Sequence, residues 1–171
     1  SGQAAPPVTL VPHDIKGLPN DNLYALLRDS DGFLWIGAHS GLYRYDGTNV
    51  EVYRQIPGDS TSLPSDAILS LLQDEHGMIW AATTHGACVF DPHTAHFEPK
   101  ALIHEGKKLT DYECRLYLDT EGTMWATNFG YGLSRYDQRA SAFVSVAEVL
   151  SAAKANDTRM SVNGMTRDTE G

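Results

Sequence analysis

Short apolar runs alternate with turn residues along most of the chain. In the first unit the runs cover 23–28, 33–38, 42–45 and 50–54, and the turns cover 29–32, 40–41 and 46–49. No helical periodicity occurs in the first 140 positions. Short apolar runs bounded by glycine, aspartate and serine are typical of β-strands joined by tight turns. The unit therefore predicts four antiparallel strands.

A motif of the form Asp-x-x-Gly-x-x-Trp occurs three times, each copy 45 residues after the last. Its positions are Asp29, Gly32 and Trp35; Asp74, Gly77 and Trp80; and Asp119, Gly122 and Trp125. Four strands in a period of this size predict the blades of a β-propeller. Aspartate oxygens accept backbone N–H groups in a tight turn, and glycine adopts positive φ there. We therefore expect these nine residues to be structural.

The apolar positions also indicate how the blades stack. The runs 23–27 and 68–72 are apolar on both faces, so we expect both faces to be covered. Small residues follow each tryptophan, at 37–38, 81–82 and 126–127, and would let neighbouring sheets approach closely. The fourth strand of each unit is more polar, which is typical of an outer edge strand. Its apolar anchors are expected to be Val52, Phe97 and Phe143.

We expect one all-β domain over 1–171, an incomplete β-propeller arc of about three four-stranded antiparallel blades. The expected parts are an outer strand at 8–12, blades at 17–54, 62–99 and 107–146, and the first strand of a truncated blade at 160–171. An alanine-rich segment predicts a short helix near 146–154. Closed propellers need four to eight blades, so we expect a fragment that self-associates through its open blade faces.

Composition excludes some partners. The chain has 13 basic and 22 acidic residues, a net charge of -9, which disfavours nucleic-acid binding. No apolar run approaches the roughly 18 residues of a membrane helix, so we expect no membrane contact by this segment. The two cysteines, Cys88 and Cys114, lack metal-site spacing. We expect two buried thiols, with a disulfide as the alternative.

Catalytic, metal and cofactor sites are not expected. The segment 29–32 begins like a calcium loop, but Ser40 stands where that loop needs a glutamate. His93 and His96 lie three residues apart on a predicted turn without an evident third ligand. The chain has no Gly-x-Ser-x-Gly elbow, and its acidic residues lie mostly in the repeated turns rather than in a catalytic pair.

The motif strings resemble a known repeat. In the first unit they are Gly17-Leu18-Pro19 with 20–23, then 29–37 and 41–46; in the second, 62–66, 74–80 and 89–91; in the third, 119–125 and 132–137. Together they are similar to the two-component regulator propeller repeat, and the resemblance covers about residues 8–171. The third unit departs from it, because Thr110-Asp111-Tyr112 replaces the Leu-Pro opening.

This resemblance implies a function. Such repeats build the periplasmic sensor region of bacterial membrane receptors, whose other domains include a histidine kinase or a cyclase. It implies a non-catalytic, ligand-sensing segment whose signal is a small molecule or an oligosaccharide. Two alternatives remain open, namely a propeller enzyme of the glycoside hydrolase or lyase type and a protein-interaction scaffold.

Candidate ligand-binding residues come from the loops that differ between units. Turns between second and third strands should share one face with the blade-to-blade connections, and such loops concentrate binding residues. The candidates there are His39, His85, Asn128, Phe129 and Tyr131. The loop 128–131 is the strongest, because it inserts one residue and two aromatics that suit a sugar ring. Packing between blades is the alternative role for this loop.

Overall fold

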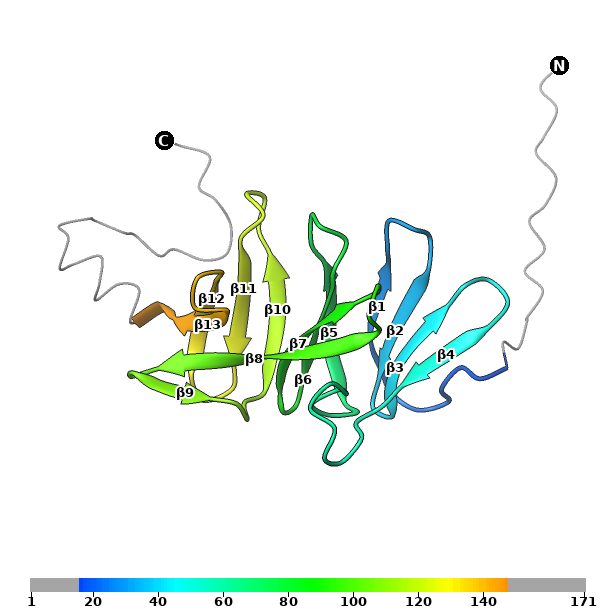
Figure 1. The fold of residues 1–171 in the computed structure, drawn as a ribbon, viewed down its shortest axis with the longest axis horizontal. Helices are drawn as coiled ribbons and strands as arrows, with labels where there is room; N and C mark the ends of the chain where they lie inside the picture. The colour runs from blue at the N-terminus through cyan, green and yellow to red at the C-terminus, as the bar shows by residue number, and fades with distance from the viewer. Residues whose placement is uncertain (1–15, 148–171) are drawn as a thin grey trace, which may run out of the picture.

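The computed structural model describes residues 16–147, which form an open arc of β-sheets (Figure 1). The strands are β1 (Leu23–Arg28), β2 (Leu34–Ala38), β3 (Gly41–Tyr45), β4 (Val50–Tyr53), β5 (Ile68–Gln73), β6 (Ile79–Thr83), β7 (Gly86–Asp91), β8 (His96–His104), β9 (Lys107–Leu109), β10 (Cys114–Leu118), β11 (Met124–Asn128), β12 (Gly132–Asp137) and β13 (Ala142–Ser145). The predicted all-β fold is confirmed.

Three four-stranded antiparallel blades account for most of these strands. Blade 1 is β1-β2-β3-β4, blade 2 is β5-β6-β7-β8 and blade 3 is β10-β11-β12-β13. Figure 1 shows them side by side in chain order. The outer strand expected at 8–12 and the strand expected at 160–171 lie outside the described residues. Of the helix expected near 146–154, only the helical residues 146–147 are described.

One feature of the topology was not predicted, namely a strand shared by two blades. Residues 96–100 of β8 pair antiparallel with β7, whereas residues 101–103 pair in parallel with 142–144 of β13. β9 folds back on the end of β8 as a hairpin. Blades 2 and 3 therefore form one continuous sheet, while blade 1 is a separate sheet. Pairing between distant outer strands leaves no local sequence pattern, so the repeat alone could not indicate it.

The same hydrogen bonds hold each Asp-x-x-Gly-x-x-Trp turn. One aspartate oxygen accepts two backbone N–H groups of the turn. The other oxygen accepts the indole N–H six residues later, at 2.7 Å in blade 1, 2.8 Å in blade 2 and 2.9 Å in blade 3. Burial acts to raise the pKa of Asp119, but the hydrogen bonds from Trp125 and the turn outweigh it and lower that pKa.

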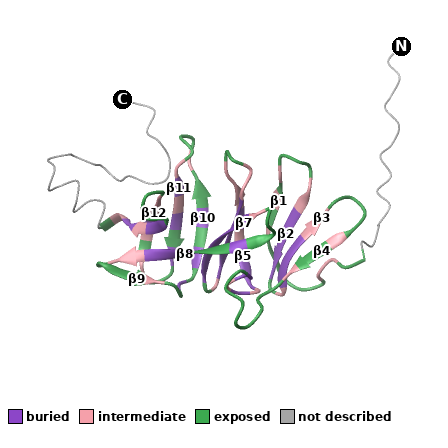
Figure 2. Ribbon diagram, in the orientation of Figure 1, coloured by how far each residue is buried: buried purple, intermediate pink, exposed green. Residues whose placement is uncertain are grey.

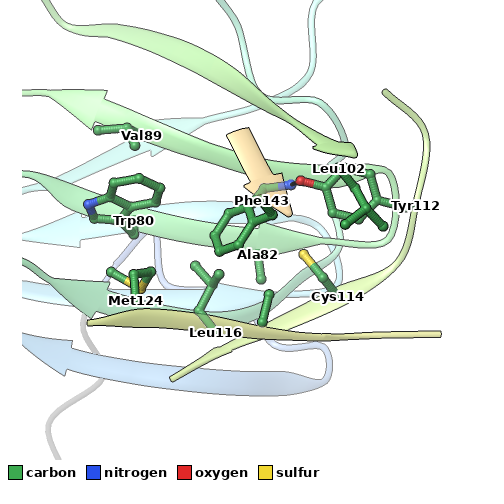
Figure 3. Packing of buried hydrophobic residues seen from close by; sticks show 11 residues of the cluster. Trp80, Ala82, Val89, Leu102, Tyr112, Cys114, Leu116, Met124 and Phe143 are labelled. Atoms are coloured by element: carbon green, nitrogen blue, oxygen red, sulfur yellow. Dashed lines mark hydrogen bonds between the residues drawn. The ribbon is translucent and has the colours of Figure 1, made fainter. Parts of the chain in front are cut away.

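Tryptophan and other aromatic side chains fill the seams between the blades. Trp35 is 1% exposed and meets Phe90 of blade 2 edge-on, with ring centroids 5.3 Å apart. Trp80 is 6% exposed and meets Tyr136 of blade 3 at 4.7 Å. Figure 3 shows this second seam, where Trp80 and Phe143 lie among aliphatic side chains. Trp125 is only partly buried, because no described blade follows it.

The ends of the arc differ from its middle. β5 contacts both neighbouring inner strands, so its two apolar faces are covered as predicted. β1 instead leaves Leu23, Tyr24 and Leu26 exposed, and β10 leaves Tyr117 and Leu118 exposed. Figure 2 shows these exposed strand surfaces in green beside the buried seams in purple.

The outer-strand anchors were predicted in part. Phe97 and Phe143 are buried, as expected. Val52 is 44% exposed, so its predicted role as an anchor is wrong. The neighbouring Tyr53 fills that place, because its ring stacks on Trp35 at 5.9 Å.

Both cysteines are buried free thiols, as expected. Burial raises the pKa of the Cys114 thiol to about 12 and also raises that of Cys88, so neither is reactive in the folded chain. Between residues 16 and 147 no helix is both long enough and apolar enough to cross a membrane.

Candidate functional site

The turns between second and third strands share a face with the segments that lead into each blade. In each blade a turn N–H donates to a carbonyl just before the first strand: His39 to Asn22 at 2.9 Å, Thr84 to Ala67 at 3.3 Å, and Phe129 to Glu113 at 2.9 Å. This confirms the predicted grouping of loops, and we call this side of the arc the loop face. The Asp-x-x-Gly turns lie at the opposite ends of the strands and form the aspartate face (Figure 1).

The five candidate residues occupy different environments on the loop face. His39 and His85 are exposed in the turns of blades 1 and 2. Phe129 is 81% exposed, whereas Asn128 is only 5% exposed and Tyr131 is half-buried against the seam between blades 2 and 3. The structure thus brings Asn128 and Tyr131 to one place, while the two histidines lie on separate turns.

Asn128 anchors the third loop with its side-chain amide. Its Nδ2 donates to Gly132 O at 3.0 Å, to Ala126 O at 3.3 Å and to Ser134 Oγ at 2.8 Å. These bonds fix which end of the amide points inward. Its Oδ1 is buried without a hydrogen-bond partner. Asn128 therefore combines a structural role with a free acceptor.

Two residues that the sequence did not suggest contact the partners of this amide or its loop. Ser145 pairs across the sheet with Ser134, and its Oγ is buried and unpartnered. His104 follows the last pair of the parallel ladder between β8 and β13, and its Nδ1 is also buried and unpartnered. The His104 ring meets Tyr131 edge-on at 5.3 Å. We call Asn128, Tyr131, Ser134, Ser145 and His104 the polar corner.

Among the three blades described, buried polar atoms without partners occur at this corner in blade 3 alone. Strand pairing identifies the counterparts of Asn128, Ser134 and Ser145 in the other two blades. In the same order, they are Ala38, Tyr43 and Val52 in blade 1, and Thr83, Cys88 and Pro99 in blade 2. Thr83 has no free capacity of this kind, since its hydroxyl donates to Gly86 O and accepts from His85 N. Comparing equivalent positions between repeats could have found Ser134 and Ser145. The residue inserted at 129–131 lengthens the spacing between Cys88 and its counterpart Ser134 from 45 to 46 residues, so a comparison at the fixed period of 45 misses the correspondence.

A concavity lies on the aspartate face, between blades 2 and 3. It has a volume of about 630 Å³. Its lining residues are Asp74, Glu75, His76, Trp80, Leu118, Glu121, Gly122, Thr123, Met124, Arg135, Tyr136, Asp137, Gln138 and Arg139. Carboxylates and guanidinium groups are thus mixed along its walls.

One residue at this cavity differs from its counterpart at the other seam. At the seam of blades 1 and 2 the Gln73 amide joins the two turns, accepting from Ser30 N at 2.8 Å and donating to Gly77 O at 3.2 Å. The equivalent residue in blade 3 is Leu118, which has no hydrogen-bonding side chain. The two turns at that seam therefore lack this bridge.

Neither face offers a metal site within residues 16–147, where no three histidine, cysteine, aspartate or glutamate side chains are arranged to hold an ion. His93 lies in the turn after β7, where Asp91 accepts its backbone N–H at 2.8 Å. His96 begins β8 and pairs with Asp91. These two histidines thus belong to an ordinary hairpin.

The fold and the three hydrogen-bonded turns define the class of protein as a β-propeller arc. Two of its repeats are similar to a known family, because the model of the family described as "Two component regulator propeller" matches residues 17–40 and 62–85. The matched segments contain the first two Asp-x-x-Gly-x-x-Trp motifs. A comparison with curated proteins gave no match.

Solved structures share the fold. The extracellular domain described as that of a one-component system from B. thetaiotaomicron is 24% identical, with a TM-score of 0.62 over 77% of this chain and 19% of that one. The extracellular domain of a hybrid two-component system from the same organism is 21% identical, with a TM-score of 0.63 over 74% and 18%. Virginiamycin B lyase from Staphylococcus aureus is 13% identical, with a TM-score of 0.51 over 68% and 38%.

The chain spans less than a fifth of the length of the two extracellular domains. At these identities the likeness establishes the propeller fold, and propellers serve both sensing and catalysis.

Proposed function

We propose that this chain is part of the extracytoplasmic, periplasmic ligand-sensing propeller of a bacterial signal-transduction receptor, and that it is not catalytic. The observation that carries this proposal is the match of its repeats to the two-component regulator propeller. The extracellular domains that share its fold support the same reading. The signal is a small molecule or an oligosaccharide, and the output domain belongs to the parent receptor.

The loop face of blade 3 is the proposed place of ligand contact. Phe129 exposes most of its ring to solvent, and Tyr131 stands beside the buried amide of Asn128. An exposed aromatic surface beside hydrogen-bonding groups suits the apolar face and the hydroxyls of a sugar. The histidine candidates His39 and His85 would serve only a ligand long enough to reach the neighbouring blades.

Replacing Phe129 by alanine tests this placement. We expect wild-type protein to show a saturable rise in Tm with one member of a panel of neutral and acidic disaccharides, and no turnover of that sugar. Phe129→Ala should abolish the rise while leaving the Tm of the free protein within about 1–2 °C, because the side chain is largely exposed.

Two controls separate this result from a general loss of structure. Phe129→Tyr keeps an aromatic ring and should keep most of the response. His76→Ala alters an exposed side chain on the aspartate face and should leave the response intact. A response lost in His76→Ala but kept in Phe129→Ala would place the ligand in the cavity between blades 2 and 3 and contradict the proposal.

We also propose that this chain self-associates through its open blade faces. Leu26 of β1 is 68% exposed, and Leu23 and Tyr24 beside it are exposed as well. At the other end of the arc, Tyr117 is exposed on the open side of blade 3, where it pairs across the strands with Trp125. Apolar surface on the end units of a repeat array is normally covered by a neighbouring unit.

Sedimentation velocity over a range of protein concentrations measures this association. We expect concentration-dependent dimers or larger species in wild-type protein, and a shift toward monomer in Leu26→Lys because a charge would be buried at the contact. The exposed His39→Ala change, on the same blade, should leave the distribution unchanged. A single monomeric species at every concentration would refute self-association.

A further inference from the structure

Buried polar atoms without partners gather at one place in the chain. In residues 16–147 four buried side-chain nitrogen or oxygen atoms lack a hydrogen-bond partner. Three of them, His104 Nδ1, Asn128 Oδ1 and Ser145 Oγ, belong to the polar corner. Buried polar atoms are nearly always paired, by protein or by a bound molecule, so each exception needs an explanation. The three atoms lie on β11, β13 and β8 of one continuous sheet, which suggests one shared partner.

Strand pairing puts these side chains on the same face of the sheet. Ser134 and Ser145 are direct cross-strand partners, whose Cβ atoms lie about 4.5–5.5 Å apart in such pairs. His104 and Ser145 are each the next residue after the paired Ile103 and Val144. Asn128 joins the same row through its 2.8 Å bond to Ser134 Oγ. The row faces blade 2, at the loop-face end of the seam that Trp80 fills.

The chemistry of the atoms limits what the partner can be. Asn128 Oδ1 can only accept a hydrogen bond, and turning the amide around would break the three bonds that Nδ2 donates, so the partner must be a donor. Ser145 Oγ and His104 Nδ1 can each donate or accept, depending on the hydroxyl rotamer and the ring tautomer. The partner can thus donate and accept at the same time.

Charge disfavours ionic partners. None of the five side chains of the corner is acidic, and only the imidazole of His104 can carry a positive charge. A cation buried there would lack a counter-charge, which is costly in a site shielded from water. A neutral hydroxyl group meets every requirement.

We propose that the polar corner is a binding site for one neutral hydroxyl group, supplied either by a water molecule or by a polyol ligand. The repeats support this assignment, since blades 1 and 2 carry alanine or a fully bonded threonine at the position of Asn128. The free hydrogen-bonding capacity belongs to blade 3, beside its inserted loop. The polyol source rests on the proposed sensing function, whereas the water source is independent of it.

Ser145→Ala tests the site by the sign of a stability change. If the Ser145 hydroxyl binds a partner, removing it loses that bond, and we expect Tm to fall by about 2–4 °C. If the hydroxyl is buried without a hydrogen bond, its burial costs free energy that nothing compensates. Removing it then leaves Tm the same or raises it. An unchanged or raised Tm overturns the proposal.

Two further variants provide a second test and a control for this result. His104→Phe keeps an aromatic ring against Tyr131 but removes Nδ1, so it should also lower Tm. Ser70→Ala removes a half-buried hydroxyl at the same seam that accepts directly from Leu116 N at 2.8 Å. It should lower Tm while leaving the polar corner intact.

Titration with glycerol and with glucose identifies the source of the hydroxyl. A saturable rise in Tm that is present in wild type and Ser70→Ala but absent in Ser145→Ala assigns the site to a polyol. Destabilisation by Ser145→Ala without any saturable rise assigns it to water. The site therefore survives a failure of the sensing proposal, because the stability change is measured without any sugar.

Discussion

Trp80→Ala is expected to cost about 3–5 kcal/mol of unfolding free energy, while Trp125→Ala costs less than half of that. Both indoles donate to the aspartate of their own turn at nearly the same distance, 2.8 and 2.9 Å. They differ in what surrounds the ring. Trp80 is packed against Tyr136 and Phe143 of blade 3, whereas Trp125 is only partly buried.

Urea denaturation of the two variants, followed by circular dichroism, measures this difference. The comparison isolates packing between blades because the motif and its hydrogen bond are common to both sites. Trp35→Ala, at the seam of blades 1 and 2, should match Trp80→Ala. At protein concentrations where the chain is monomeric, equal losses at Trp80 and Trp125 would contradict the open end of the arc, since they would require a partner on the Trp125 face.

Gly37→Val is expected to destabilise the chain by about 1–3 kcal/mol by forcing blades 1 and 2 apart. A Cβ atom at position 37 would lie 2.7 Å from Ile68 Cγ2 and 3.1 Å from Ala25 Cβ. Ile68 is fully buried and its β-branched side chain is stiff, so it cannot turn aside. The backbone of Gly37 is not at positive φ, so the cost comes from the close approach of the sheets.

The third blade provides the control for this change. Thr127 occupies the position equivalent to Gly37 but is exposed. Thr127→Val places the same side chain at the equivalent exposed position, where no neighbouring blade is crowded, and should change the unfolding free energy by no more than about 0.5 kcal/mol. Thermal unfolding of both variants makes the comparison. If Gly37→Val were as mild as Thr127→Val, the tight seam between blades 1 and 2 would be wrong.

Local sequence pattern was enough to predict the fold because each blade is built from local signals. Turn residues, apolar runs and the recurring tryptophans all act within one unit, and the structure follows them from β1 to β7. The second half of β8 does not, because its partner β13 lies about 40 residues further along the chain. No periodicity within a unit can encode such a pairing.

The candidate site was predictable only in part for a similar reason. Asn128, Phe129 and Tyr131 stood out because their loop breaks the repeat. His104 and Ser145 did not, because their role depends on strands brought together by the shared β8. Leu118 could not be recognised from the sequence either, because it matters only as the counterpart of Gln73, whose amide bridges two turns at the other seam.

Because β8 is shared by blades 2 and 3, the repeating unit of the sequence does not coincide with the hydrogen-bonded unit of the structure. The sequence repeats once per blade, yet β8 is both the fourth strand of blade 2 and the hydrogen-bonded neighbour of the outer strand of blade 3. In a simple repeat array each unit contributes its own stability and touches only its neighbours through side chains. Here blades 2 and 3 also share backbone hydrogen bonds and form one module, whereas blade 1 is a sheet of its own. A duplication, deletion or exchange of one 45-residue unit at this point would leave a strand edge with unpaired backbone N–H and C=O groups.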